Sequence, residues 1–113
     1  MNNEMLTLVS PVVIPESIIV QDEGELPRGL YYYAITSVGY KESVSDHILQ
    51  VYAPHKGNSI ILSWKSTEGV SEYRVYRGTI LGQYDGYFTI YSVRNCCYIA
   101  DNGTGELNLN ICQ

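Results

Sequence analysis

Residues 58–78 constrain the fold of this chain more than any other stretch. They read NSIILSWKSTEGVSEYRVYRG, in which apolar and polar residues alternate on both sides of the polar turn STEGVS. Successive side chains of a β-strand point to opposite faces of the sheet, so this alternation predicts two strands that each bury one face. The segment therefore favours a protein built from β-sheets.

The same alternation identifies the side chains that are expected in the core. Ile60, Leu62 and Trp64 share one face of the first strand. In the earlier stretch LYYYAITSV, residues 30–38, Tyr33 and Ile35 fall together on one face. Sheet-on-sheet packing brings such residues together in a layer about 10 Å thick. The predicted core residues are Tyr33, Ile35, Leu62, Trp64 and Val75.

Further short strands are expected along the chain, bounded by Gly, Pro, Asn and Asp. No segment shows helical periodicity, because the apolar residues recur with period two or in short runs. About seven to nine short strands at this spacing predict an all-β sandwich. The expected strands span residues 30–38, 46–53, 59–65, 72–77, 87–93 and 98–101, with turns or loops at 21–29, 39–45 and 54–58.

The domain organisation is expected to be simple. A chain of 113 residues suits one domain. Pro11 and Pro15 each lack an N–H group and restrain the residue before them, so the stretch around them belongs in an arm or at a sheet edge. We expect an extended N-terminal arm or edge strands at residues 1–20, the sandwich at 21–106, and a C-terminal strand or tail at 107–113.

Charge and composition argue against several classes of function. The net charge is −5 and the seven basic residues are scattered, whereas nucleic-acid binding needs clustered Lys and Arg. No apolar run approaches the roughly 18 residues of a membrane span, and the N-terminal sequence lacks the pattern of a signal peptide. The three Cys make no disulfide framework, which fits synthesis in a reducing cytoplasm.

The residues that are suited to catalysis or metal binding are expected to be structural. His47 follows Asp46 at the start of a strand, but no nucleophile motif such as G-x-S-x-G accompanies them. The segment DNGTGE, residues 101–106, is too short for a calcium loop and is expected to form a turn. Adjacent Cys96 and Cys97 would project to opposite faces of a strand. We therefore expect a non-enzymatic protein with no metal site and no cofactor.

Two features of the sequence are candidates for contact with a partner. The chain has 11 Tyr but one Phe and one Trp, and Tyr suits surfaces that become half buried on binding, although aromatics also simply fill β positions. The acidic stretch at residues 22–25 is expected to be a solvated turn, with docking onto a basic partner surface as the alternative. The candidate contact residues on outer faces are Tyr32, Tyr76, Tyr87 and Tyr91.

Four segments resemble strands of fibronectin type III domains. SIILSWKSTEGVSEYRVYRG resembles the second and third strands, with Trp64 as the core Trp. GYFTIYSV and CCYIADNG resemble the next two, and ELPRGLYYYAITSVGYKESVSD resembles the sixth strand with its flanking turns. In that last segment, Tyr31 matches the Tyr of the tyrosine corner. The resemblance implies a fibronectin type III-like or Ig-like β-sandwich.

The order of these segments departs from the family, because the sixth-strand segment precedes the second-strand segment. Three explanations stay open: a circular permutation that places Asp101 near Leu26, a sandwich of different topology, or completion of each half by a neighbouring subunit. The same order is similar to that of Ig-like modules in tailed-phage virion proteins.

This resemblance implies a bacteriophage virion structural protein, an auxiliary or decoration protein bound to the capsid. Its partners would be the major capsid protein or other virion proteins, together with self-association, and it would be made in the host bacterial cytoplasm and located in the virion. One alternative is a tail, collar or baseplate component. Another is a carbohydrate-binding or adhesion module that binds a surface glycan through its Tyr faces.

Overall fold

The structure is a computed structural model that describes residues 13, 15–39, 42–43, 47–66, 69–91 and 96–104. Within these residues the regular structure consists of β-strands only. The strands are β1 (Pro15–Leu26), β2 (Gly29–Val38), β3 (Ile48–Ala53), β4 (Asn58–Lys65), β5 (Glu72–Gly78), β6 (Gly86–Tyr91) and β7 (Cys96–Asp101).

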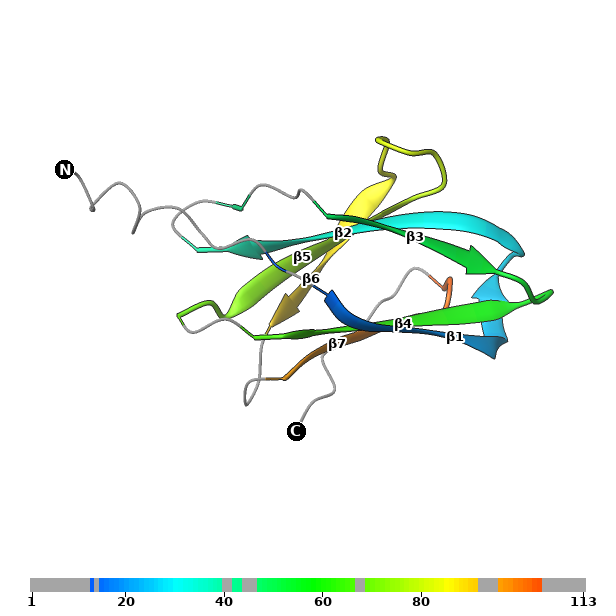
Figure 1. The fold of residues 1–113 in the computed structure, drawn as a ribbon, viewed down its shortest axis with the longest axis horizontal. Helices are drawn as coiled ribbons and strands as arrows, with labels where there is room; N and C mark the ends of the chain where they lie inside the picture. The colour runs from blue at the N-terminus through cyan, green and yellow to red at the C-terminus, as the bar shows by residue number, and fades with distance from the viewer. Residues whose placement is uncertain are drawn as a thin grey trace.

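The strands form two antiparallel sheets that pack face to face (Figure 1). The three-stranded sheet has the order β1-β4-β7, and the four-stranded sheet has the order β3-β2-β5-β6. Two hairpins, β2–β3 and β5–β6, lie side by side in the four-stranded sheet through the pairing of β2 with β5. The expected all-β sandwich is therefore confirmed.

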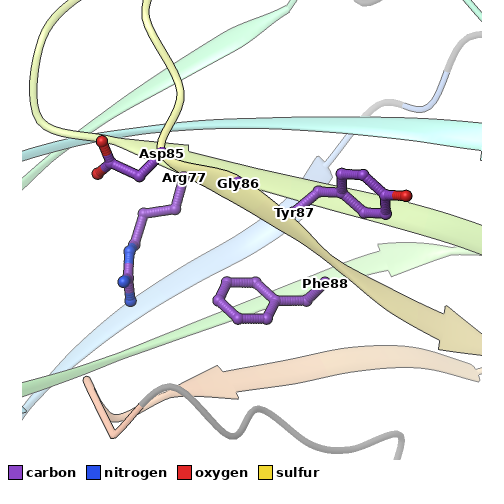
Figure 2. A pocket seen from close by; sticks show the side chains of 5 residues that line it. All are labelled: Arg77, Asp85, Gly86, Tyr87 and Phe88. Atoms are coloured by element: carbon purple, nitrogen blue, oxygen red, sulfur yellow. The ribbon is translucent and has the colours of Figure 1, made fainter.

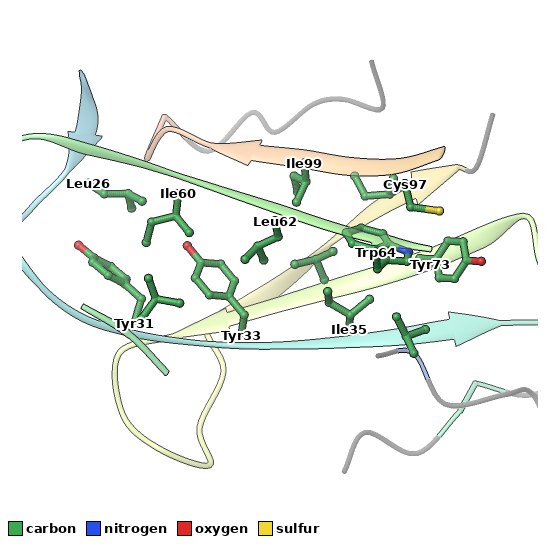
Figure 3. Packing of buried hydrophobic residues seen from close by; sticks show 14 of the residues in the cluster. Leu26, Tyr31, Tyr33, Ile35, Ile60, Leu62, Trp64, Tyr73, Cys97 and Ile99 are labelled. Carbon is green, nitrogen blue, oxygen red and sulfur yellow. The ribbon is translucent and has the colours of Figure 1, made fainter. Parts of the chain in front are cut away.

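The core lies between the two sheets and consists of the side chains that alternate inward (Figure 3). Trp64 on β4 packs against Tyr73 on β5, with their ring centroids 5.5 Å apart and the rings at 67°. Such edge-to-face contacts between aromatic rings are favourable beyond the area that they bury. All five predicted core residues are at most 2% exposed, so the face assignment is confirmed: Tyr33, Ile35, Leu62, Trp64 and Val75.

Most strand boundaries agree with the expected ranges to within a residue or two, but the acidic turn expected at residues 21–29 is wrong. β1 continues through this stretch as far as Leu26, which pairs with Asn58 on β4. It therefore crosses the expected boundary between arm and sandwich at residues 20 and 21, as an edge strand of the three-stranded sheet. The expected strand or tail at 107–112 lies outside the described residues.

A bulge explains why a segment of turn-like composition remains attached to the sheet. The register of β1 against β4 shifts between Gln21 and Leu26. Gly24 has φ +140°, and a Cβ atom there would lie 2.3 Å from the carbonyl oxygen of Asn58. Ser59 holds the bulge on β4 by donating a 2.5 Å hydrogen bond to the carbonyl oxygen of Glu23. Glycine thus permits a close backbone approach that any other residue would block.

One local prediction from the sequence is confirmed at the start of β2. The hydroxyl of Tyr31 donates a 2.6 Å hydrogen bond to the carbonyl oxygen of Pro27, which is the geometry of a tyrosine corner. The N–H of Glu25 on β1 donates a 2.8 Å hydrogen bond to the carbonyl oxygen of Asn102. The end of β7 therefore lies beside the end of β1, as the permutation among the three explanations for the strand order would place it.

Candidate functional site

The candidate contact residues share one surface, the outer face of the four-stranded sheet. Tyr32 on β2, Tyr76 on β5, and Tyr87 and Tyr91 on β6 all alternate with residues that point into the core. Tyr87 and Tyr91 are 48% and 59% exposed, whereas Tyr32 and Tyr76 are half-buried. We call this surface the tyrosine face.

Part of the tyrosine face is a compact group of three rings. Tyr76 pairs with Tyr87 across the β5–β6 register, and their ring centroids are 5.2 Å apart. Tyr84, in the connection between β5 and β6, packs on the other side at 5.7 Å from Tyr76. The sequence analysis missed Tyr84, because a residue in the turn-like segment GQYDG follows no strand alternation.

Glu42, from the connection between β2 and β3, lies over the tyrosine face and accepts hydrogen bonds from three strand residues. The hydroxyl of Thr36 donates to Oε2 at 2.6 Å, and the hydroxyl of Tyr76 donates to the same oxygen. The guanidinium of Arg74 donates to Oε1 at 2.9 Å. Arg74 also lies over the ring of Tyr87, with 4.7 Å between the guanidinium carbon and the ring centroid. These contacts fix the orientation of the rings.

A shallow depression of about 280 Å³ opens beside this network. Tyrosine rings and a carboxylate meet at its wall, so the depression presents both an apolar surface and a hydrogen-bond acceptor. Its lining residues are Ala34, Thr36, Glu42, Ser43, Tyr76 and Tyr84.

The hydrogen bonds set the ionisation of Glu42. Partial burial alone would raise the pKa of Glu42, but the hydrogen bonds from Thr36, Tyr76 and Arg74 and the charge of Arg74 outweigh burial and lower it. The pKa of Tyr76 is raised by burial and by its hydrogen bond to the charged Glu42. Glu42 is therefore held as a carboxylate at neutral pH.

We expect Glu42→Gln to lower the free energy of unfolding at pH 7 by about 1 kcal/mol, because an amide keeps the size but loses the charge-assisted hydrogen bonds and solvent screens part of the effect. A carboxylate whose pKa is lowered by folding stabilises above its unfolded pKa, near 4.3, and loses that stabilisation as pH falls through its folded pKa. Urea unfolding curves recorded at several pH values should therefore differ most between the two proteins at pH 7 and converge as Glu42 becomes protonated at low pH. A constant difference would contradict this role for the charge.

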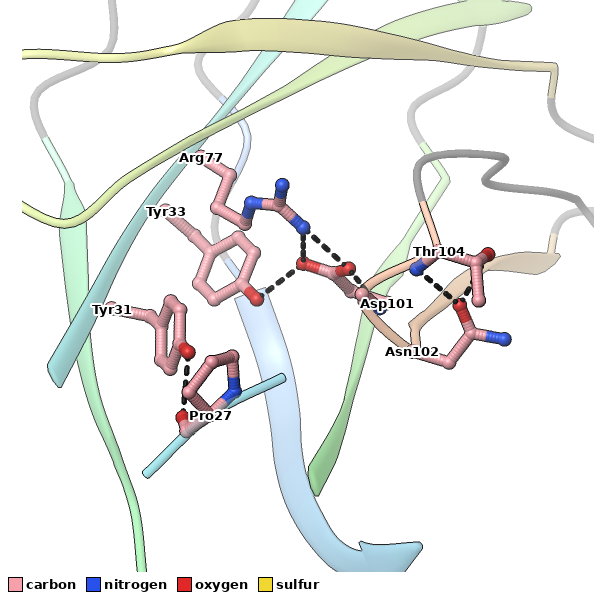
Figure 4. A network of polar contacts seen from close by, with 8 residues as sticks. Pro27, Tyr31, Tyr33, Arg77, Asp101, Asn102 and Thr104 are labelled. Atoms are coloured by element: carbon pink, nitrogen blue, oxygen red, sulfur yellow. Dashed lines mark hydrogen bonds and ion pairs between the residues drawn. The ribbon is translucent and has the colours of Figure 1, made fainter. Parts of the chain in front are cut away.

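A second polar network lies inside the sandwich and joins the two sheets (Figure 4). Asp101 on β7 is 1% exposed. It accepts a 2.6 Å hydrogen bond from the hydroxyl of Tyr33 on β2 and two hydrogen bonds, at 2.7 and 2.9 Å, from the guanidinium of Arg77 on β5. The N–H of Gly103 donates a further hydrogen bond of 3.1 Å to Asp101. We call these side chains, Tyr33, Arg77 and Asp101, the cross-sheet triad.

Burial raises the pKa of Tyr33 far above its ordinary value, and the charge of Asp101 adds to this shift. Burial would lower the pKa of Arg77, but its hydrogen bonds to Asp101 reverse the direction and raise it. Tyr33 therefore stays neutral and Arg77 stays charged across the physiological pH range, which suits a structural role. The turn expected at DNGTGE begins here, since Asn102 Oδ1 accepts hydrogen bonds from the N–H and the hydroxyl of Thr104.

The outer side of Arg77 borders a small cavity of about 190 Å³ (Figure 2). Its guanidinium carbon lies 5.6 Å from the ring centroid of Phe88. The guanidinium already donates to Asp101, so its charge is compensated before any anion reaches the cavity. The lining residues are Arg77, Asp85, Gly86, Tyr87 and Phe88.

The other side chains that are chemically suited to catalysis or metal binding do not gather at one site. His47 is exposed, and Nδ1 of His55 lies 3.7 Å from a carboxylate oxygen of Asp22. Cys97 is buried in the core. Within the described part of the chain, no group of three or more His, Cys, Asp or Glu side chains is placed to hold a metal ion. No helix among these residues has the length and apolar character to cross a membrane.

The fold and these surfaces define an all-β protein in which two antiparallel sheets form a sandwich. Comparisons with models of protein families, with curated proteins and with solved structures found no match for the chain.

Proposed function

We propose that this chain is a non-enzymatic bacteriophage virion structural protein, an auxiliary or decoration protein that binds the capsid through its tyrosine face. The observation that carries the proposal is the concentration of exposed large apolar side chains on one sheet. Most of them belong to the four-stranded sheet or to its β5–β6 connection: Leu30, Ile48, Tyr52, Ile80, Leu81, Tyr87 and Tyr91.

Such a surface has the chemistry of a protein interface. Aromatic residues are enriched where proteins contact one another, and Tyr provides a large contact area with few rotatable bonds. The Glu42 network holds Arg74 and Tyr76 in place before any partner arrives, which lowers the entropy that binding would otherwise lose. The tyrosine face therefore suits a passive and permanent contact better than a catalytic cycle.

The order of the strand segments in the sequence is the basis for proposing a particular partner. The strand order of this chain is similar to that of Ig-like modules in tailed-phage virion proteins. The proposed partners are the major capsid protein or other virion proteins, with the virion as the location.

The test is binding of the purified protein to phage particles that lack it. We expect the double variant Tyr87→Ala with Tyr91→Ala to lose about 700-fold in affinity, because central aromatic contacts in interfaces are each worth about 2 kcal/mol and the variant removes two of them. Tyr98→Ala, on the outer face of the three-stranded sheet, is the control and should bind as the original protein does. Affinity is measured by sedimentation of the particles followed by quantification of the bound protein.

Unchanged binding of the double variant would contradict the role of the tyrosine face. Immunogold labelling of the same particles distinguishes a decoration protein from a tail, collar or baseplate component. Labels spread over the head would support decoration, whereas labels confined to the tail or neck would favour the alternative.

One observation favours a second candidate, a carbohydrate-binding or adhesion module. The depression beside Tyr76 and Tyr84 presents aromatic rings and the Glu42 carboxylate together. Sugars stack their apolar faces on aromatic rings, and their hydroxyl groups donate hydrogen bonds to carboxylates. Saturable binding on a glycan array that is lost in Tyr84→Ala would support this function, and particle binding without glycan binding would exclude it.

A further inference from the structure

β1 forms one edge of the three-stranded sheet, and no other strand in the described part of the chain pairs with its far side. Its regular stretch pairs residues 17–21 with β4, and residues 16 and 22 flank that stretch. We call residues 16–22 the β1 edge. The unpaired N–H and C=O groups of such an edge are able to accept an additional strand.

Two rows of apolar side chains, one on each face of the three-stranded sheet, end at the β1 edge. Ile18 continues the inner row of side chains from Leu62, and Ile19 continues the outer row from Ile61. Ile18 is 41% exposed and Ile19 is 50% exposed, although they point to opposite faces of the sheet. A single surface patch cannot cover both residues, whereas one added strand covers both at once.

The charges of the β1 edge select the kind of segment that it accepts. Glu16 and Asp22 are exposed carboxylates at its two ends, and Glu23 and Glu25 follow them on the same strand. β1 contains no Lys or Arg. A second copy of β1 is disfavoured, because antiparallel pairing centred on Ile19 would place Glu16 of one copy opposite Asp22 of the other.

We infer that the β1 edge binds an extended segment of a partner protein that is apolar at its centre and basic at its ends. Backbone hydrogen bonds would add this segment to the three-stranded sheet as a new edge strand. Its apolar side chains would cover Ile18 and Ile19, and its Lys or Arg residues would lie near Glu16 and Asp22. This surface is separate from the tyrosine face and does not depend on the proposed capsid role.

The probe is the synthetic peptide Lys-Lys-Val-Thr-Val-Thr-Val-Lys-Lys, titrated into the whole chain by isothermal calorimetry at low salt. We expect saturable binding that weakens as salt is added. Replacing both Thr by Pro keeps the charge but prevents strand pairing, and replacing the four Lys by Glu keeps the strand but reverses the charge. Both altered peptides should bind at least about tenfold more weakly.

Hydrogen–deuterium exchange then locates the site. Amides in β1 should exchange more slowly when the Lys-Val-Thr peptide is bound, while amides in β6 should be unaffected. The variant Glu16→Lys with Asp22→Lys should lower the affinity about tenfold. The variant Glu72→Lys with Asp85→Lys makes the same change of net charge on and beside the four-stranded sheet and should bind as the original does.

Three outcomes would overturn the inference. Equal binding of the Pro-containing peptide would show attraction by charge alone. Protection of amides outside β1 would place the site elsewhere. Slow exchange in β1 before the peptide is added, together with a dimeric mass in sedimentation, would show that a second copy already occupies the edge.

Discussion

Asp101→Ala is expected to lower the free energy of unfolding by about 3–5 kcal/mol, the largest effect of any single substitution considered for this protein. Asp101 is buried and is the common acceptor for Tyr33 and Arg77, which belong to the opposite sheet. Removing the carboxylate leaves the partly buried guanidinium of Arg77 without its partner and the buried hydroxyl of Tyr33 without its acceptor. Chemical denaturation followed by Trp64 fluorescence measures the loss.

A control variant separates two contributions to the free energy of unfolding: the cost of leaving a charge unpaired and the net stabilisation by the intact triad. Replacing all three members by apolar residues of similar size, Tyr33→Phe with Arg77→Met and Asp101→Leu, removes the buried charges together. This triple variant should be more stable than Asp101→Ala, with a residual deficit from the N–H of Gly103. If Asp101→Ala unfolds at the denaturant concentration of the original protein, the triad does not hold the sheets together.

Leu62→Ala is expected to lower the free energy of unfolding by about 2–5 kcal/mol. Leu62 lies on the central strand of the three-stranded sheet and is fully buried, so truncation removes apolar contacts and leaves a cavity between the sheets. Thermal unfolding monitored by circular dichroism in the β-sheet region provides the measurement.

Leu30→Ala is the matched control, because it makes the same chemical change at an exposed position on β2. It should alter the free energy of unfolding by only about 0.5 kcal/mol. Equal melting temperatures for Leu62→Ala and the original protein would show that the two faces of β4 have been assigned the wrong way round.

The elements that the sequence predicted well are those that depend on neighbours along the chain. Alternation in β4 and β5 was sufficient to place Leu62, Trp64 and Val75 in the core. The hydroxyl of Tyr31 reaches a carbonyl oxygen only four residues earlier, at Pro27, so a local pattern was enough to predict it. In both cases the period of the strand or the geometry of one turn determines the outcome.

The elements that the sequence did not predict depend on residues far apart in the chain. Asp101 was expected where the last strand ends and a turn begins, with no side-chain partner assigned to it, whereas its partner Tyr33 is separated from it by 68 residues. Glu42 resembled an ordinary turn residue, yet it accepts a hydrogen bond from Arg74, which is 32 residues away. Local propensity carries no information about such pairs, because they form only when the two sheets and their connections are assembled.

The acidic stretch was assigned to a turn for the same reason. Its Asp, Glu and Gly residues have low strand propensity, and this propensity alone predicts a turn. Local propensity does not include the backbone pairing that β4 offers to this stretch. The bulge at Gly24 lets the backbone stay beside Asn58 despite its composition. Pairing with β4 therefore outweighs the low strand propensity of the acidic stretch.

The position of the cross-sheet triad has a consequence for the order of folding. The hairpins β2–β3 and β5–β6 join strands that are close in sequence and are able to form early, whereas Asp101 comes from β7, the last described strand. If β1 and β4 docked onto the four-stranded sheet without β7, Arg77 would be partly covered without its counter-charge. We therefore expect a half-closed sandwich to be unfavourable, so that the two sheets close cooperatively and only together with β7.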